Sequence, residues 1–203
     1  MPTAKFLTYT GQEINLQSPD PETIRLMDIA HALGNICRYN GQCSKFLSVA
    51  EHSINCALYI RGQDLGQRLE LLALLHDAAE AYIGDMARPL RTVLPEFSLI
   101  EDRFMAAIYQ ALGVEPPDKW EQAQVAAADQ AVLSSEFAVL LPGGYKYSDP
   151  GSGAGLIKFK HYPPRVAALQ FMSTLADVDF PLWHRGTELN MPIRAATVRE
   201  GGA

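Results

Sequence analysis

Residues 69–77 read Leu-Glu-Leu-Leu-Ala-Leu-Leu-His-Asp, and this stretch decides what kind of fold the chain can form. Its apolar side chains would cover nearly every side of a helix, which is the pattern of a helix buried among other helices. The sequence predicts such a helix over about 66–82. His76 and Asp77 stand together at the polar end of the apolar run, so both side chains can reach one ion beside that end.

Helical patterns extend to both sides of this segment. Apolar residues at helical spacing, with capping residues at several starts, predict further helices over about 22–36, 45–61, 96–112, 118–140 and 163–177. Gly84 and Pro89 predict a loop after the 66–82 helix. Residues 142–155 are too rich in Gly and Pro for regular structure. The sequence therefore favours a fold in which helices provide nearly all of the core.

The first twenty residues differ from the rest of the chain. Strand-like runs over 5–9 and 13–16 flank Thr10-Gly11, a pair typical of turns, and predict a short β-hairpin. No internal repeat is found, and 203 residues is a usual length for one domain. We expect a single all-α domain over 1–203, with its core over about 22–177 and the hairpin at its start.

The composition indicates a protein that binds a small molecule rather than a nucleic acid. A net charge of −6, from 23 acidic and 17 basic residues, argues against a broad nucleic-acid surface. Charges interrupt every apolar run before the ~18 residues that a membrane span needs, and residues 1–6 lack the pattern of a signal peptide. We therefore expect a cytoplasmic protein with neither a nucleic-acid partner nor a membrane partner.

The three cysteines and His31 are not predicted to take part in the function. The cysteines Cys37, Cys43 and Cys56 have no CxxC spacing, so we expect free, partly buried thiols rather than a disulfide or a cysteine-based zinc site. His31 lies on an apolar helical stretch and is expected to be a core or helix-end histidine.

Two further residues join His76 and Asp77 as candidate metal ligands. His52 lies on the helix that precedes them, and Asp129 lies among alanines in the middle of an apolar helical face, where a solvated charge is not expected. Two imidazoles and two carboxylates suit Mn, Co, Fe, Zn or Ni better than calcium, and they leave positions open for water and substrate. The alternative for Asp129 is a buried carboxylate paired with an arginine.

The order of these candidate ligands resembles that of the HD-domain phosphohydrolase superfamily, namely His52, then His76-Asp77, then Asp129. Within that superfamily, the segment 51–53 (Glu-His-Ser), followed by 76–85 (His-Asp-Ala-Ala-Glu-Ala-Tyr-Ile-Gly-Asp), is similar to bacterial 5′-deoxynucleotidases and to phage HD-type deoxynucleoside triphosphate hydrolases. The resemblance runs over about residues 28–136. It implies an HD-domain helical bundle, and such relatives commonly form homo-oligomers.

The same resemblance implies roles for single residues. The four ligands would bind one divalent transition metal (Zn, Co, Mn, Fe or Ni), with additional Mg or Mn accompanying the substrate phosphates. Glu80 and Asp85 match acids that position or activate the attacking water, and Arg38 matches an arginine that holds the substrate phosphate. Arg91 falls where relatives carry a basic residue and is a further candidate for phosphate contact, whereas Arg88 has no matching role. The alternatives are a surface acid at Glu80, a helix-terminating polar residue at Asp85 and a surface cation at Arg38.

The implied function is a metal-dependent phosphohydrolase that acts on deoxynucleotides, through attack of a metal-activated water on phosphorus. Monophosphates (a 5′-nucleotidase) and triphosphates (a dATPase-like hydrolase) are both open as substrates. Elementary chemistry agrees, because a cation lowers the pKa of a bound water, a carboxylate accepts its proton and an arginine fork suits a phosphate.

Two other functions compete with this one. A hydrolase of alarmones of the ppGpp type is less favoured, because Ala81 stands where the pattern His-Asp-x-x-Glu-Asp has its last acid. The other alternative is a metal-stabilised, nucleotide-binding regulatory protein without turnover. The intact acids Glu80 and Asp85 argue against it, since a site that has lost activity would be expected to lose them first.

Overall fold

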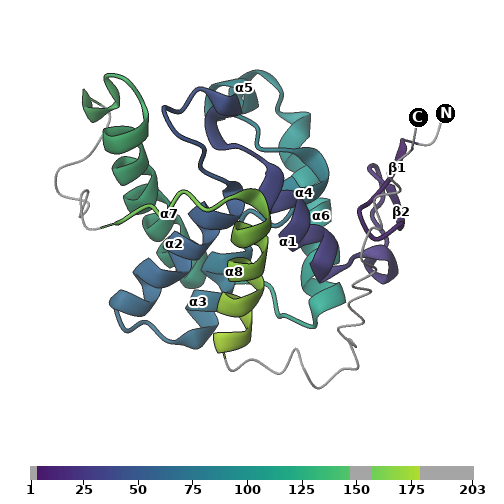
Figure 1. Cartoon of the computed structure of the whole chain (residues 1–203). Coiled ribbons are helices and arrows are strands. Elements are labelled where there is room, and N and C mark those ends of the chain that lie inside the picture. The colour runs from purple at the N-terminus through teal and green to yellow at the C-terminus, as the bar shows by residue number, and fades with distance from the viewer. Residues whose placement is uncertain (1–3, 147–156, 179–203) are drawn as a thin grey trace, which may run out of the picture.

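The apolar run over residues 69–75 forms helix α3 (Gln67–Leu75), and every residue of that run is buried. The helix is enclosed by other helices because it has no polar face to turn toward water. Its neighbours are α2 (Val49–Gly62), α7 (Lys119–Leu140) and α8 (Pro164–Asp177) (Figure 1). The predicted burial of this segment is confirmed.

The structure is a computed structural model that describes residues 4–146 and 157–178. Over these residues the chain is mostly helical, with a short antiparallel hairpin near the N-terminus, as predicted. The remaining helices are α1 (Leu26–Asn35), α4 (Glu80–Ile83), α5 (Arg88–Val93) and α6 (Glu96–Leu112). None of the helices in these two ranges has the length and apolar character that crossing a bilayer requires. Most of the 142–155 stretch, and the tail beyond residue 178, lie outside the described residues.

Most of the predicted helix boundaries agree with the structure. The predictions 96–112, 118–140 and 163–177 correspond to α6, α7 and α8 to within one residue. Helix α2 begins a few residues later than predicted, because the Ser48 hydroxyl is its N-cap and accepts a hydrogen bond from the Glu51 N–H. Helix α1 also begins later, after a 3-10 turn at Pro21–Thr23.

The helix predicted over 66–82 is divided in two by the structure. Helix α3 ends at Leu75, α4 begins at Glu80, and the residues between them form turns. The N–H groups of Ala78 and Glu80 donate to carbonyls three residues earlier, at 2.9 and 3.0 Å, so the backbone tightens there from α-helical to 3-10 geometry. His76 and Asp77 therefore lie in a tight turn rather than inside a helix.

The loop predicted at Gly84 and Pro89 is correct at its start and wrong at its end. Gly84 ends α4 with a φ of +81°, a conformation that favours glycine. Pro89, however, lies in the first turn of the short helix α5, where a proline costs little because N–H groups there lack intrahelical partners.

The N-terminal hairpin is confirmed, with shorter strands than predicted. Strands β1 (Lys5–Leu7) and β2 (Glu13–Asn15) pair antiparallel, and Ile14 brings the hairpin into contact with the core. The Asp28 carboxylate on α1 accepts hydrogen bonds from the N–H and the hydroxyl of Thr10, at 2.7 and 2.8 Å. These bonds attach the hairpin to the helical domain.

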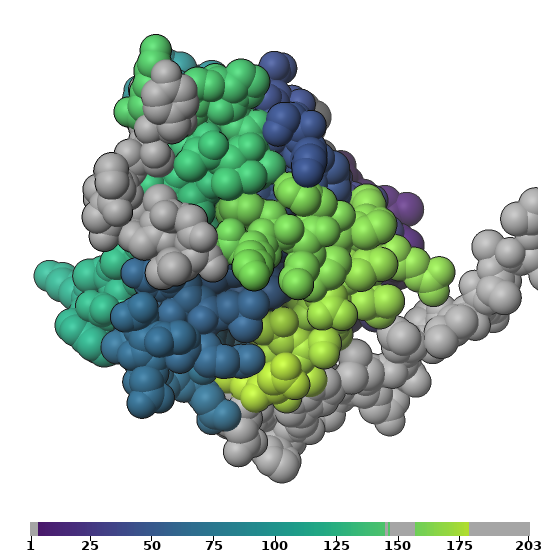
Figure 2. Space-filling view, turned by 60° about the vertical axis from the view of Figure 1, so that its left-hand side comes forward, coloured from purple at the N-terminus to yellow at the C-terminus, as the bar shows by residue number. Residues whose placement is uncertain are grey.

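Residues 157–178 close one side of the domain. Figure 2 shows them as a continuous strip, green to yellow, beside the blue surface of α2 and α3. The buried carboxylate of Glu51 on α2 accepts hydrogen bonds from the backbone N–H groups of Lys160, His161 and Tyr162, at 2.6, 2.9 and 2.8 Å. Glu51 thus fixes the start of this strip next to His52.

Candidate metal centre

The four residues predicted as metal ligands come together from three parts of the fold. His52 lies on α2, His76 and Asp77 in the turn after α3, and Asp129 on α7. His52 Nε2 is 3.2 Å from Asp129 Oδ1 and 3.6 Å from Asp77 Oδ2, and Asp77 Oδ2 is 3.2 Å from His76 Nε2. Atoms bonded to one ion at about 2.0–2.3 Å lie about 3–4 Å from each other, so these separations suit a shared ion.

Both imidazoles present Nε2 to the shared space, because Nδ1 is used elsewhere. Nδ1 of His76 lies 2.8 Å from the carbonyl oxygen of Ala73, and Nδ1 of His52 lies 2.7 Å from the Glu136 carboxylate. Both partners are acceptors, so each Nδ1 carries a proton and donates it. Metal-binding histidines are oriented in the same way.

The Nε2 atom of His76 is buried and has no hydrogen-bond partner in the part of the chain that the structure describes. Asp77 Oδ2 is 3.2 Å from it, at ion-pair distance but without a hydrogen bond. A buried polar atom without a partner is costly, and a cation would provide the missing one. The residues present therefore fit a metal ion.

The charges around His52 favour a positive group at its Nε2. Burial and the Arg38 guanidinium lower the pKa of His52, but Cys56, Glu136 and the hydrogen bond to Asp129 raise it well above the usual value. Burial raises the pKa of Asp129, whereas His52 and His76 lower it to about 2. A proton and a metal ion would therefore compete for the same position between His52 and Asp129.

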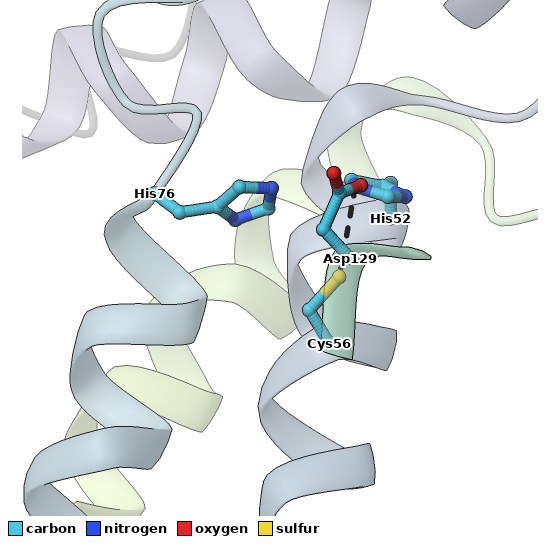
Figure 3. A group of neighbouring side chains, drawn as sticks. All are labelled: His52, Cys56, His76 and Asp129. Carbon is cyan, nitrogen blue, oxygen red and sulfur yellow. Dashed lines mark hydrogen bonds and ion pairs between the residues drawn. The ribbon is translucent and has the colours of Figure 1, made fainter. Parts of the chain in front are cut away.

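Cys56 also lies in this cluster, which the sequence analysis did not predict. Ligand atoms of His52, Cys56, His76 and Asp129 all lie within 4.8 Å of one another, so the cluster can hold a metal ion. Figure 3 shows His76 facing the other three side chains, with Cys56 one turn below His52 on α2. The spacing of four residues between His52 and Cys56 puts both on one helix face, and this was the signal available in the sequence.

Glu136 is a further residue that the sequence analysis missed. It lies on α7 and is fully buried. Its carboxylate accepts hydrogen bonds from His52 Nδ1, from the Tyr39 hydroxyl and, at 3.0 Å, from Arg38 Nε. Burial raises the pKa of Glu136, but Arg38, His52 and Tyr39 together lower it to about 2. Glu136 is thus an anion that orients both His52 and Arg38. It lies seven residues after Asp129, on the same face of α7.

Arg38 lies between Glu136 and the candidate ligands. Its side chain is only 9% exposed, which excludes the alternative of a surface cation. While Nε donates to Glu136, Nη1 lies 3.7 Å from Asp77 Oδ2. One edge of the guanidinium is therefore anchored and the other faces the cluster.

Glu80 and Asp85 share the electrostatic environment of the cluster. Glu80 is 2% exposed, so it is not a surface acid, and its Oε2 has no hydrogen-bond partner among the described residues. Burial and the charges of Asp77 and Asp85 raise its pKa well above the usual value. The pKa of Asp85 is also raised, by burial and by Asp77, although Arg38 and His52 act against this.

The two arginines of α5 both contact carboxylates. Arg91 donates to Glu80, at 3.2 Å, and to Glu101, so its charge is largely neutralised within the protein. Arg88 Nη2 lies 2.6 Å from Asp129 Oδ2. The arginine pairing that was the alternative for Asp129 therefore exists, but it uses one oxygen and leaves Oδ1 facing His52.

A hollow of about 280 Å³ opens beside His76 and Asp129. Its other walls come mainly from α3, α6 and α7 and are largely apolar, with Met105, Tyr109 and Val125 among them. The candidate metal centre thus has an apolar surface next to it.

Comparison with known proteins finds relatives for part of the chain. The uncharacterized protein YfdR of Escherichia coli is 36% identical over 109 residues, which cover 54% of this chain and 58% of YfdR. An uncharacterized protein of Rhodobacter capsulatus is 37% identical over 110 residues, covering 52% of this chain and 56% of the relative. The chain therefore spans less than two thirds of the length of these relatives. No family model matches it.

Proposed function

We propose that this chain is a metal-dependent phosphohydrolase of the HD-domain type that acts on deoxynucleotides. The observation that carries the proposal is the convergence of two imidazole Nε2 atoms and two carboxylates on one space, with His76 Nε2 buried and unpartnered among the described residues. His52, His76, Asp77 and Asp129 would hold the metal. When bound, a divalent cation lowers the pKa of water and offsets the charge on phosphoryl oxygens.

Arg38 would bind the substrate phosphate. Its Nε is occupied by Glu136, so the guanidinium is held in place before substrate arrives, and Nη1 lies on the side of the cluster. An arginine oriented in advance loses little side-chain entropy when it binds a phosphoryl oxygen. Glu136 would therefore orient Arg38 for the substrate phosphate and His52 for the metal.

Glu80 would transfer the proton. A carboxyl group whose pKa is raised by burial and by neighbouring acids keeps its proton to a higher pH than a free carboxyl group, and it can donate or accept that proton during a reaction. Asp85, also raised in pKa, would orient the water beside it. Glu80 would thus transfer the proton, and Asp85 would position the water.

The charges at the centre favour a substrate with one phosphate. Arg91, a candidate for additional phosphate contacts, already donates to Glu80 and Glu101, and Arg88 is paired with Asp129. Among the described residues, only Arg38 directs an edge of its guanidinium at the cluster from a buried position. We therefore propose deoxynucleoside monophosphates as the substrate class, with the base lying against the apolar hollow beside His76 and Asp129.

The test is a substrate panel on the full chain, freed of metal by a chelator and reloaded with one divalent metal at a time. Nucleoside and inorganic phosphate should be released from deoxynucleoside monophosphates with transition metals, and much less from ribonucleotides, triphosphates or alarmones. Release from triphosphates alone would contradict the proposed phosphate count. Folded, metal-loaded protein with no turnover on any substrate would favour the regulatory alternative.

The Glu80→Gln variant separates metal binding from turnover. Because Glu80 is assigned to proton transfer and not to the ligand set, the variant should keep its metal and lose at least about 100-fold in turnover. Metal content by elemental analysis and phosphate release would be measured on the same sample. Loss of the metal in this variant would instead make Glu80 a ligand.

A further inference from the structure

Cys56 lies among the candidate ligands, yet the proposed ligand set leaves it without a role. It is fully buried on α2, one turn after His52, and its Sγ is 3.6 Å from His52 Nε2. We propose that the Cys56 thiolate is an additional ligand of the same metal ion, which gives the centre a sulfur donor beside its nitrogen and oxygen donors. This inference rests on the metal site of the proposed function, but not on its substrate.

The distances suit coordination by sulfur. A sulfur at about 2.3 Å and an imidazole nitrogen at about 2.0–2.1 Å from one ion are about 3.6 Å apart at a tetrahedral angle. The separation of Cys56 Sγ from His52 Nε2 is 3.6 Å, and both lie within 4.8 Å of the ligand atoms of His76 and Asp129. One ion can therefore contact the sulfur without a rearrangement of α2.

The hydrogen bonding of Cys56 supports the same conclusion. In the part of the chain that the structure describes, its Sγ is hydrogen-bonded to His52 Nε2, the nitrogen that would bind the metal. A cation that takes the lone pair of this nitrogen also removes the partner of the thiol. Coordination of the sulfur restores a partner to it, just as coordination gives one to the unpartnered His76 Nε2.

Cys56 packs in the hydrophobic core of the domain and also contacts the candidate ligands. A buried thiol that serves only packing is expected among apolar side chains. The Cys56 sulfur, in contrast, also contacts the His52 imidazole and lies within 4.8 Å of the ligand atoms of His76 and Asp129.

A sulfur ligand would change which metals the site prefers. Thiolate is a soft donor, so it favours zinc, cobalt or iron(II) over magnesium or manganese. With His52, His76, Asp77 and Asp129, Cys56 would be the fifth protein ligand. A six-coordinate ion would then keep one position for water or substrate, with the angle between the sulfur and His52 Nε2 near tetrahedral rather than a right angle.

Spectroscopy of the cobalt(II)-loaded full chain tests this assignment. The wild-type protein should show sulfur-to-cobalt charge-transfer absorption in the near ultraviolet, and the Cys56→Ser variant should lose it. The matched controls are Cys37→Ser and Cys43→Ser, whose thiols lie 3.7 Å from each other and outside the cluster, and both should keep the absorption. X-ray absorption of zinc-loaded wild-type protein should show one sulfur at about 2.3 Å.

The outcomes separate this inference from the proposed function. If wild-type protein binds cobalt and zinc without any sulfur signal, Cys56 is not a ligand, while the metal site and the hydrolase proposal stand. If Cys56→Ser keeps the absorption, the assignment is likewise overturned. If wild-type protein binds no metal at all, both proposals fall. The X-ray measurement uses wild-type protein, so the answer does not depend on whether a variant folds.

Discussion

Two places in this molecule hold a histidine and an aspartate on or next to a helix of the core, and they differ in what surrounds the aspartate. At the hairpin, Asp28 receives two hydrogen bonds from Thr10, and His31 stacks on Tyr9 with ring centroids 3.7 Å apart. In the metal centre, by contrast, Asp77 faces two Nε2 atoms, and His76 Nε2 has no hydrogen-bond partner among the described residues. The protein itself satisfies Asp28 at the hairpin, whereas at the candidate metal centre it leaves His76 Nε2 without a hydrogen-bond partner among the described residues.

The size of the adjoining hollow does not distinguish the two places. The hollow beside Asp28 and His31 measures about 340 Å³, and the one beside His76 and Asp129 measures about 280 Å³. Burial does not identify the candidate site either, since Asp28 is 2% exposed whereas the side chain of Asp77 is 17% exposed. What identifies the candidate site is His76 Nε2, a buried nitrogen without a hydrogen-bond partner among the described residues. His31 was expected to be a core or helix-end histidine, but it lies in the middle of α1, is only half-buried and stacks on the exposed Tyr9.

Removal of Asp77 should have the largest effect. Loss of a group that only orients a metal ligand already costs about 10–100-fold in metal affinity, so the ligand variant Asp77→Ala should lose more than that, together with phosphatase activity. Elemental analysis after dialysis and phosphate release would be measured, and circular dichroism should show the helical fold retained. Asp102→Ala is the matched control, because this aspartate is exposed on α6. Full activity in Asp77→Ala would refute the metal centre.

Removal of Glu136 should cost the most stability. The Glu136→Ala variant leaves Arg38 buried without its main partner, and breaking a buried pair in this way costs about 3–5 kcal/mol. Urea unfolding of metal-free protein would measure the change in unfolding free energy. Glu136→Gln keeps the shape and should cost less. Equal stability of Glu136→Ala and wild-type protein would show that Arg38 finds another partner.

The sequence predicts those features that depend on neighbouring residues. The helix over 96–112 follows from local periodicity and a stop at Gly113, which adopts a left-handed conformation with φ of +65°. Asp129 can be recognised because a carboxylate is out of place on an apolar helical face. The break between His76 and Glu80 could not be predicted, because nothing in that run disfavours a continuous helix and the packing around it decides the geometry.

Features that depend on contacts between distant helices were also missed. Glu136 meets His52 across 84 positions of sequence, and Arg88 meets Asp129 across 41. Neither pairing leaves a local pattern, because each requires that two elements lie side by side. Cys56 shows the intermediate case, since its spacing from His52 was visible but its proximity to His76 and Asp129 was not.

At the hairpin, Asp28→Ala should reduce stability and leave the metal unchanged. The variant removes two hydrogen bonds from Thr10, and an unsatisfied donor in a part-buried site costs about 1–3 kcal/mol. Thr10→Val removes only the hydroxyl bond and should cost less. Urea unfolding and metal content would be measured on both variants. If Asp28→Ala lost its metal, the distinction between the two places would fail.

The smallest change in stability is expected at Glu121 on α7, whose carboxylate has hydrogen-bond partners within the protein. Glu121 accepts hydrogen bonds from Arg68 on α3 and from the Asp118 N–H, and these contacts lower its pKa below the usual 4.5, although burial acts against them. A carboxyl group with a depressed pKa in the folded state stabilises the protein above its unfolded pKa, near 4.5, and this contribution disappears as the pH falls through the lower folded value.

The Glu121→Gln variant should therefore flatten the loss of stability below about pH 4.5, with a difference at neutral pH of roughly 1 kcal/mol or less, because the ion pair is near the surface. Urea unfolding of metal-free wild-type and variant protein across this pH range would measure it. Metal content and turnover should be unchanged, because Arg68 and Glu121 lie outside the cluster. If this part-buried pair contributed as much to the unfolding free energy as Glu136 does, a carboxylate outside the candidate metal centre would be as important for stability as the fully buried one that contacts His52.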